Sequence, residues 1–145
     1  MTTTRVTYAD VRAVIDYPIE QVWALIACFG GLERWAAGVS ACELEGNGVG
    51  AVRTVHLGNR SARERLEAID PNSYRLRYHI LPPHAMPAED VYSEIILTAI
   101  GSDRTEMVWR SEASDFAIPP DELGARIETF YGKSIEGLKR LLDGG

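Results

Sequence analysis

The chain has 145 residues, 46% of them hydrophobic and 25% charged, which is the balance of a soluble globular protein with one sizeable core. Its formal net charge of −6 argues against a general affinity for nucleic acid, because phosphate binding needs a clustered basic face. No apolar run approaches the ~20 residues of a membrane span, and residues 1–8 lack the apolar core of a secretory signal. We therefore expect one cytoplasmic domain over residues 1–145.

The first third of the chain predicts a strand followed by two short helices. Residues 5–16 are rich in Val, Thr and Tyr, which favours a strand. Pro18 and Glu20 indicate a helix start, since proline suits the first helical position and the helix dipole favours an anion there. Gly30-Gly31 predicts the end of this helix, and a second short helix is expected over residues 32–37.

Turn signals divide the middle of the chain into short strands. Gly-Asn-Gly, Gly-Asn, Asp-Pro-Asn and Gly-Ser-Asp sequences mark tight turns, and a longer loop with proline and histidine covers residues 81–89. Strands at this regular spacing indicate an antiparallel meander. The six predicted strands are residues 41–45, 49–57, 61–69, 73–81, 91–100 and 105–115.

The last segment, residues 119–144, predicts a long amphipathic helix. It begins with Pro-Pro-Asp-Glu, a helix-start signature, and its apolar residues recur on one face. The order of elements buries this face only if the sheet wraps the helix. The predicted fold is therefore α+β, with a curved seven-stranded antiparallel sheet around the C-terminal helix.

Strand parity, by which residues two apart share a face, indicates which side chains point inward. In residues 73–81 the inward row includes Tyr78 and Ile80. The apolar rows of the two preceding strands each contain one charge, Arg53 and Glu64, which predicts an inward cross-strand pair. A buried charge is costly, so this implies a pair or a wet cavity; the alternative is a pair that reaches water at a strand end and only fixes register.

Strand 91–100 leaves two assignments open. Val91, Ile95 and Leu97 compete with Tyr92 for the core. If Tyr92 points inward, Glu94 does so too, because the two residues share a face.

Four segments carry a resemblance to a known family. Val22–Trp35, Gly48–Thr54, Glu64–Asp70 and Tyr131–Leu141 resemble the START/Bet v 1-like (SRPBCC) superfamily, most closely its polyketide cyclase/dehydrase branch. The similarity covers nearly the whole chain in order. It implies the helix-grip fold, with two short helices after the first strand and an enclosed pocket for a hydrophobic small molecule.

The resemblance also implies site residues. Plant abscisic-acid receptors share the Glu-Arg-Leu-(Asp/Glu) motif, whose first glutamate lines the ligand cavity, and that position is Glu64 here. The resemblance agrees with parity on Arg53 and Tyr78, and it favours Tyr92 and Glu94 pointing inward. Two carboxylates in one apolar cavity repel, so one becomes a usable general acid or base. Glu64, Glu94 and Arg53 are therefore the candidate catalytic residues, with Arg53 binding an enolate oxygen.

Two functions stay open, of which the enzyme is the expected one and the binding protein is its alternative. One is a cofactor-free cyclase, aromatase or dehydratase acting on a polyketide-like substrate. The other is a non-catalytic carrier or sensor of a lipid, sterol or aromatic metabolite. Trp35-Ala36-Ala37 stands where many relatives in this branch have Trp-His-Pro, and the missing histidine favours the carrier.

The expected partner is a hydrophobic or aromatic small molecule, bound by a monomer or a homodimer. No cofactor and no metal are expected, since no two histidines share a suitable spacing with a carboxylate. Trp35 and Trp109 either line the pocket or only pack in the core. The candidate ligand-binding residues are Trp35, Val55, Leu57, Leu66, Tyr78, Ile80, Tyr92, Trp109, Ile127, Phe130, Tyr131 and Ser134.

Overall fold

The computed structural model describes residues 4–144 and contains a seven-stranded antiparallel sheet. Strand β1 (Val6–Ile15) is followed by helix α1 (Ile19–Ile26) and the 3-10 helix η1 (Phe29–Arg34). The remaining elements are β2 (Ala41–Glu45), β3 (Val52–Leu57), β4 (Arg60–Asp70), β5 (Arg75–Ile80), β6 (Glu89–Ile100), β7 (Arg104–Ser114) and α2 (Pro120–Leu142). The strand order is β1-β7-β6-β5-β4-β3-β2, so every strand after β1 pairs with its neighbour in sequence.

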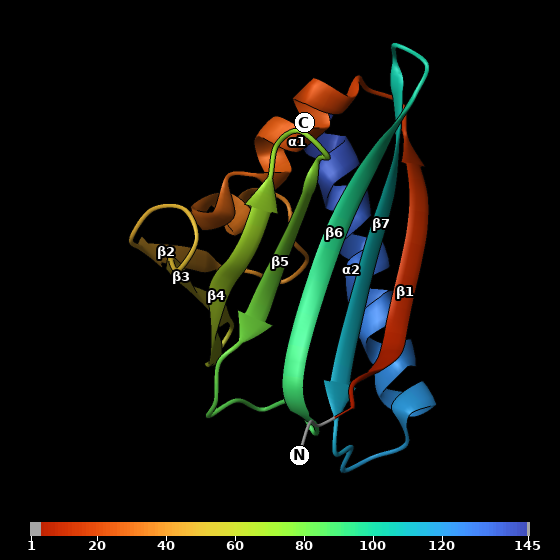
Figure 1. The fold of residues 1–145 in the computed structure, drawn as a ribbon. Helices are drawn as coiled ribbons and strands as arrows, with labels where there is room; N and C mark the ends of the chain where they lie inside the picture. The colour runs from red at the N-terminus through yellow and green to blue at the C-terminus, as the bar shows by residue number, and fades with distance from the viewer. Residues whose placement is uncertain (1–3, 145) are drawn as a thin grey trace.

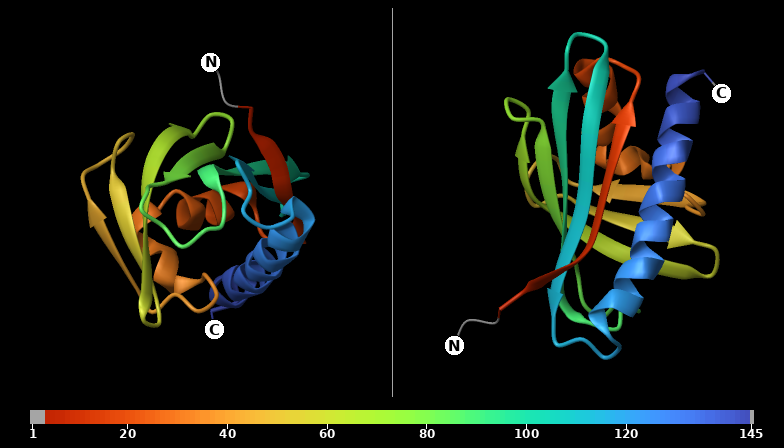
Figure 2. Two further views of the ribbon diagram at one scale, coloured as in Figure 1. Left: turned by 90° about the horizontal axis from the view of Figure 1, so that it is seen from below. Right: turned by 90° about the vertical axis from the view of Figure 1, so that its right-hand side faces the viewer.

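The sheet curves around one long helix, as predicted from the element order. Figure 1 shows α2 lying behind the sheet, and Figure 2 shows it closing the open side of the curve against β1. The short helices α1 and η1 cover one end of the structure, near the C-terminal end of α2 (Figure 1). The α+β helix-grip fold is confirmed. None of the helices between residues 4 and 144 is long and apolar enough to cross a bilayer.

Most predicted strand boundaries differ from the structure by one or two residues, and two elements differ by more. Strand β3 begins at Val52 rather than at residue 49, because the glycines at positions 46, 48 and 50 have φ angles of 91°, 64° and 94° and lengthen the turn. The second short helix is a 3-10 helix over Phe29–Arg34 rather than a helix over residues 32–37. Neither change alters the pairing of the sheet.

Two glycines set how closely α2 approaches its neighbours. A Cβ atom added to Gly124 would lie 2.0 Å from the Tyr8 carbonyl oxygen, and one added to Gly137 would lie 2.1 Å from the Trp35 carbonyl oxygen. Glycine inside a helix costs about 1 kcal/mol relative to alanine. At these two positions the absence of a side chain permits backbone contact with β1 and with the end of η1. These contacts hold α2 against the sheet.

Candidate functional site

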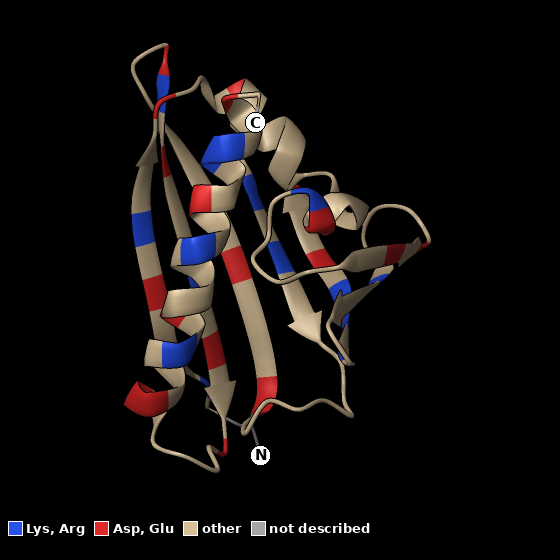
Figure 3. Ribbon diagram, turned by 180° about the vertical axis from the view of Figure 1, so that it is seen from behind, with Lys and Arg blue, Asp and Glu red and all other residues tan. Residues whose placement is uncertain are grey.

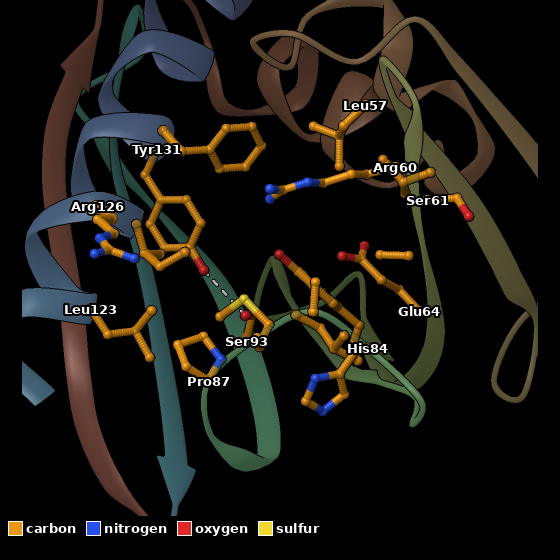
Figure 4. A pocket seen from close by; sticks show the side chains of 18 of the residues that line it. Leu57, Arg60, Ser61, Glu64, His84, Pro87, Ser93, Leu123, Arg126 and Tyr131 are labelled. Carbon is orange, nitrogen blue, oxygen red and sulfur yellow. Dashed lines mark hydrogen bonds between the residues drawn. The ribbon is translucent and has the colours of Figure 1, made fainter. Parts of the chain in front are cut away.

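A cavity of about 320 Å³ lies between the inner face of the sheet and α2 (Figure 4). This volume is at the lower end of the range for small-molecule sites, and most of the lining is apolar or aromatic, as such sites usually are. The lining residues are Tyr8, Leu32, Val55, Leu57, Arg60, Ser61, Ala62, Glu64, Tyr78, Ile80, His84, Ala85, Met86, Pro87, Ser93, Trp109, Leu123, Arg126, Ile127, Phe130 and Tyr131.

The mouth of the cavity is defined by its exposed lining residues, Arg60, Ser61, Ala85 and Arg126. They come from the start of β4, the loop between β5 and β6, and the second turn of α2. In Figure 1 these segments all lie toward the lower end of the structure, away from α1. The cavity therefore opens to solvent at the end of the sheet where α2 begins.

A buried ion pair lies at one wall. Arg53 Nε donates to Glu64 Oε1 at 2.7 Å, and Arg53 Nη1 donates to the Phe29 carbonyl oxygen at 3.1 Å. The Arg53 guanidinium also lies over the rings of Phe29 and Tyr78, 3.9 and 4.7 Å from their centroids. Strands β3 and β4 pair these residues directly, Arg53 opposite Glu64, so the predicted inward cross-strand pair is confirmed. Glu64 lines the cavity, and Arg53 lies behind it.

A tyrosine beside this pair has a proton to donate. Trp109 Nε1 donates to the Tyr78 hydroxyl oxygen at 3.1 Å, so that hydroxyl keeps its own proton for Ser93, which lies within reach, or for a ligand. Burial, reinforced by the Glu64 carboxylate, raises the pKa of Tyr78 from its ordinary value of 10.0 to about 12. Tyr78 is therefore a neutral hydrogen-bond donor at neutral pH, and it is a poor base.

Four connected hydroxyl groups begin next to Tyr78, at Ser93 on the adjacent strand β6. Ser111 Oγ lies 2.7 Å from the Tyr8 hydroxyl and 3.1 Å from Ser93 Oγ, which in turn lies 3.1 Å from the Tyr131 hydroxyl. Burial raises the pKa values of Tyr8 and Tyr131, so these phenols also stay neutral. Glu64 of β4, Tyr78 of β5 and Ser93 of β6, joined by Tyr131 of α2, thus form one polar wall in a mainly apolar lining.

Most of the predicted ligand-binding residues line this cavity. The seven that do so, besides Tyr78, are Val55, Leu57, Ile80, Trp109, Ile127, Phe130 and Tyr131. The rings of Trp109 and Tyr131 stack at 3.9 Å, which makes a flat aromatic wall suited to a planar ligand. Of the alternatives for Trp109, pocket lining therefore describes it.

Three predicted ligand-binding residues are structural instead. Trp35 packs 5.6 Å from the Trp109 ring and lies outside the lining, so it belongs to the core. Leu66 of β4 is buried in the hydrophobic core and does not line the cavity. Ser134 accepts a hydrogen bond from the Ala37 backbone N–H at 2.9 Å, and so joins α2 to the segment after η1.

The inward orientation predicted for Tyr92 and Glu94 is wrong. Ser93 of β6 is paired directly with Tyr78 of β5, and directly paired residues share a face, so Ser93 points inward and its two neighbours point outward. Glu94 is nonetheless only 5% exposed, because Arg75 and Arg110 cover it on the outer face.

Tyr92 lies in the same outer network as Glu94. Its ring stacks on His79 at 4.2 Å and lies under the guanidinium groups of Arg5 and Arg77, at 4.4 and 4.8 Å. Neither Tyr92 nor Glu94 can contact a ligand in the cavity. The predicted pair of catalytic carboxylates is therefore divided by the sheet, with Glu64 inside and Glu94 outside.

The sequence reasoning missed several polar lining residues. Ser93 belongs to the row Val91, Ser93, Ile95, which parity had offered as the competing inward face. Arg60 and Arg126 are exposed residues of separate segments, and no local pattern joins them. Among residues 4–144 no group of three His, Cys, Asp or Glu side chains is placed to hold a metal ion.

Comparison with known families agrees with the fold. The model of a family described as polyketide cyclase / dehydrase and lipid transport matches residues 5–143. No curated protein matches the chain. The family match covers nearly the whole described chain, cavity included.

Solved structures with low sequence identity share the fold. An uncharacterised protein from Bacillus thuringiensis superposes with a TM-score of 0.82 at 21% identity, over 95% of this chain and 98% of that one. The protein XoxI from Bacillus cereus gives 0.80 at 21% identity, over 92% and 94%. Ara h 8.0201 gives 0.77 at 17% identity, over 98% and 100%. These likenesses concern the fold alone.

Proposed function

The chain belongs to the polyketide cyclase/dehydrase and lipid transport family of the START/Bet v 1-like superfamily, and we propose from this that it binds a small hydrophobic molecule in the cavity under α2 and carries or senses it unchanged. The observation that carries the proposal is the combination of an aromatic, mainly apolar cavity with a fixed polar wall. Such cavities bind by burying apolar surface and select by a few placed polar groups.

The polar wall supports a ligand with a hydroxyl or carbonyl group at its inner end. Tyr78 offers a proton, and the carboxylate of Glu64, held by Arg53, offers an acceptor to the same space. A hydroxyl group satisfies both residues at once, because it donates to Glu64 and accepts from Tyr78. A ligand with only apolar atoms would make no hydrogen bond to the Tyr78 hydroxyl or to the second oxygen of the Glu64 carboxylate.

The separation of the carboxylates favours carriage over catalysis. The acid–base chemistry first considered needed Glu64 and Glu94 in one cavity, and Glu94 is paired with two arginines on the outer face. Glu64 in turn is held by Arg53 in a 2.7 Å ion pair, which occupies one of its carboxylate oxygens and fixes the orientation of the side chain. The remaining groups are suited to orienting a ligand.

Titration with N-phenyl-1-naphthylamine, a neutral dye that fluoresces in apolar sites, tests the binding function. We expect saturable binding that is lost in Ala62→Phe, whose ring would occupy the cavity, and kept in Ala99→Phe, where the residue is exposed on β6. Equal binding by both variants would place the dye elsewhere and refute the proposal. A thermal melt of each variant confirms that it is folded.

A cyclase or dehydratase activity is the second candidate, favoured by one observation: Glu64 and Tyr78 present an acceptor and a donor to the same space. Mass spectrometry of the small molecules extracted from purified protein separates the two. A carrier yields the same compound from the natural chain and from Glu64→Gln. An enzyme whose base is Glu64 yields a product from the first and accumulated substrate from the second.

A further inference from the structure

Two cations stand at the mouth of an acidic protein's cavity. Arg60 and Arg126 both line it, although the chain carries a net charge of −6. Figure 4 shows Arg60 extending into the cavity from the β4 side and Arg126 on the opposite, α2 side. Elsewhere the charges are mixed: on the side seen in Figure 3, Lys and Arg alternate with Asp and Glu along α2.

Arg60 makes no ion pair with any residue that the structure describes. Within the described residues, no carboxylate lies within 4.0 Å of its guanidinium, whereas Arg126 is paired with Glu122 at 3.1 Å. The turn Gly58-Asn59 starts β4 at Arg60, and Gly58, with a φ of 66°, permits the tight reversal that brings this residue to the mouth. An unpaired guanidinium over an apolar cavity is a site for an anion.

A buried polar atom next to the mouth residue Ala85 has no hydrogen-bond partner among residues 4–144. His84, in the loop between β5 and β6, lines the cavity, and its Nδ1 atom is buried without a hydrogen bond. A buried polar atom without a partner costs free energy that a ligand atom could recover. Because His84 lines the same cavity as Arg60 and Arg126, this atom supports a ligand that carries a polar group.

The inner charges do not oppose an anion. Glu64 is the acidic residue among the lining side chains, and the ion pair with Arg53 balances its charge. Glu122 likewise balances the charge of Arg126, so the charge of Arg60 is the net positive charge of the site. The field along the cavity therefore runs from a neutral inner end to a positive mouth.

We propose that the ligand is an anionic amphiphile, an apolar body with one carboxylate-like group that Arg60 and Arg126 bind at the mouth. This inference rests on the proposed binding function and adds the class and direction of the ligand. The apolar body enters first and packs on Trp109 and Phe130. The anion stays at the solvent edge, where its desolvation cost is smallest.

Two dyes with the same skeleton test it. 8-Anilino-1-naphthalenesulfonate is N-phenyl-1-naphthylamine with one added sulfonate, so the ratio of their affinities isolates the anion. We expect Arg60→Gln to weaken sulfonate binding about tenfold, as for the loss of one charge-assisted hydrogen bond, and to leave the neutral dye unchanged. We expect the double variant Arg60→Gln/Arg126→Gln to lose the remaining preference for the sulfonate dye over the neutral dye. The matched control is Arg104→Gln, an exposed arginine away from the mouth.

The outcomes separate the two proposals. Failure of the neutral dye to bind, or its indifference to Ala62→Phe, refutes the binding function itself. Binding of both dyes with a ratio that Arg60→Gln and Arg126→Gln leave unchanged keeps the binding function and overturns the anionic class. Raising the salt concentration to 1 M shortens the electrostatic range to about 3 Å. It should reduce the ratio of the two dye affinities in the natural chain and leave it unchanged in the double variant Arg60→Gln/Arg126→Gln.

Discussion

Removal of Arg53 is expected to destabilise the fold strongly, because it leaves a carboxylate unpaired in the cavity wall. Arg53 is 4% exposed and Glu64 9%, so water reaches neither charge freely. Breaking one side of a buried ion pair costs about 3–5 kcal/mol, a large share of the 5–15 kcal/mol that stabilises a typical domain. We expect Arg53→Met to fall near the lower value, since Glu64 borders a cavity that water can enter.

A double-mutant cycle supplies the magnitude of the coupling. Glu64→Leu alone leaves the Arg53 guanidinium without its carboxylate partner, and is expected to lower the free energy of unfolding by about 3 kcal/mol as well. Arg53→Met with Glu64→Leu replaces both charges by apolar groups, and leaves mainly the Phe29 carbonyl without its donor, a cost of about 1–2 kcal/mol. The expected coupling between the two positions is therefore about 4 kcal/mol.

Urea unfolding followed by tryptophan fluorescence measures the three variants against the natural chain. Should a single variant fail to fold, rescue by the second substitution still reports the coupling. The reasoning would be refuted by an additive double variant, or by an Arg53→Met protein as stable as the natural chain. Either result would mean that the pair is solvated rather than buried.

The remaining predictions concern α2, the outer face and the tyrosine. Gly137→Ala should destabilise by about 2 kcal/mol through overpacking, whereas Gly132→Ala, with open space around it, should stabilise by up to about 1 kcal/mol in the same urea assay. Glu94→Gln should lower stability by about 1–3 kcal/mol and leave dye affinity unchanged, since Glu94 lies outside the cavity. The raised pKa of Tyr78 predicts that its contribution to stability is complete below pH 10 and is lost as pH rises through about 12.

Each of these has a result that contradicts it. A stabilising Gly137→Ala would show that α2 is free to move from Trp35. If Glu94→Gln stayed folded and still lost dye binding, Glu94 would belong to the binding site after all. For Tyr78, the fall in stability between pH 8 and pH 11 should be smaller in Tyr78→Phe, because phenylalanine does not titrate; an equal fall would contradict the buried phenol.

The fold was predictable because its signals are local. Turn dipeptides separate the strands, and helical spacing marks α1 and α2, so the order of elements follows from short windows. The ion pair was predictable for the same reason, since Arg53 and Glu64 interrupt apolar rows on two hairpin neighbours. Parity and turn position together fix such a pair.

The inner face of strand β6 was mispredicted because its outer face is also partly covered. Val91 and Ile95 pack in the core, and on the other side Tyr92 and Glu94 are covered by arginines of neighbouring strands. Hydrophobic alternation identifies the inner face only when the outer face is left to solvent. The resemblance then favoured an alignment of β6 that is one residue out of register. A shift of one residue moves every side chain of a strand to the opposite face of the sheet.

The mouth was beyond prediction from local patterns. Arg60 and Arg126 are 66 positions apart in sequence, and each is an ordinary exposed arginine by its own surroundings. Only the closure of the sheet against α2 makes them face one cavity. Sites of this kind depend on tertiary structure more than on motif.

The most direct measurement of the central claim is a titration of isotope-labelled protein with N-phenyl-1-naphthylamine, followed by amide NMR. Binding in the cavity predicts saturable shifts at Val55, Ile80 and Ile127, which line it, and none at Thr98 or Glu106, which are paired at the far end of β6 and β7. Saturable shifts confined to the outer face, or no shifts at dye concentrations that saturate fluorescence, would contradict the claim.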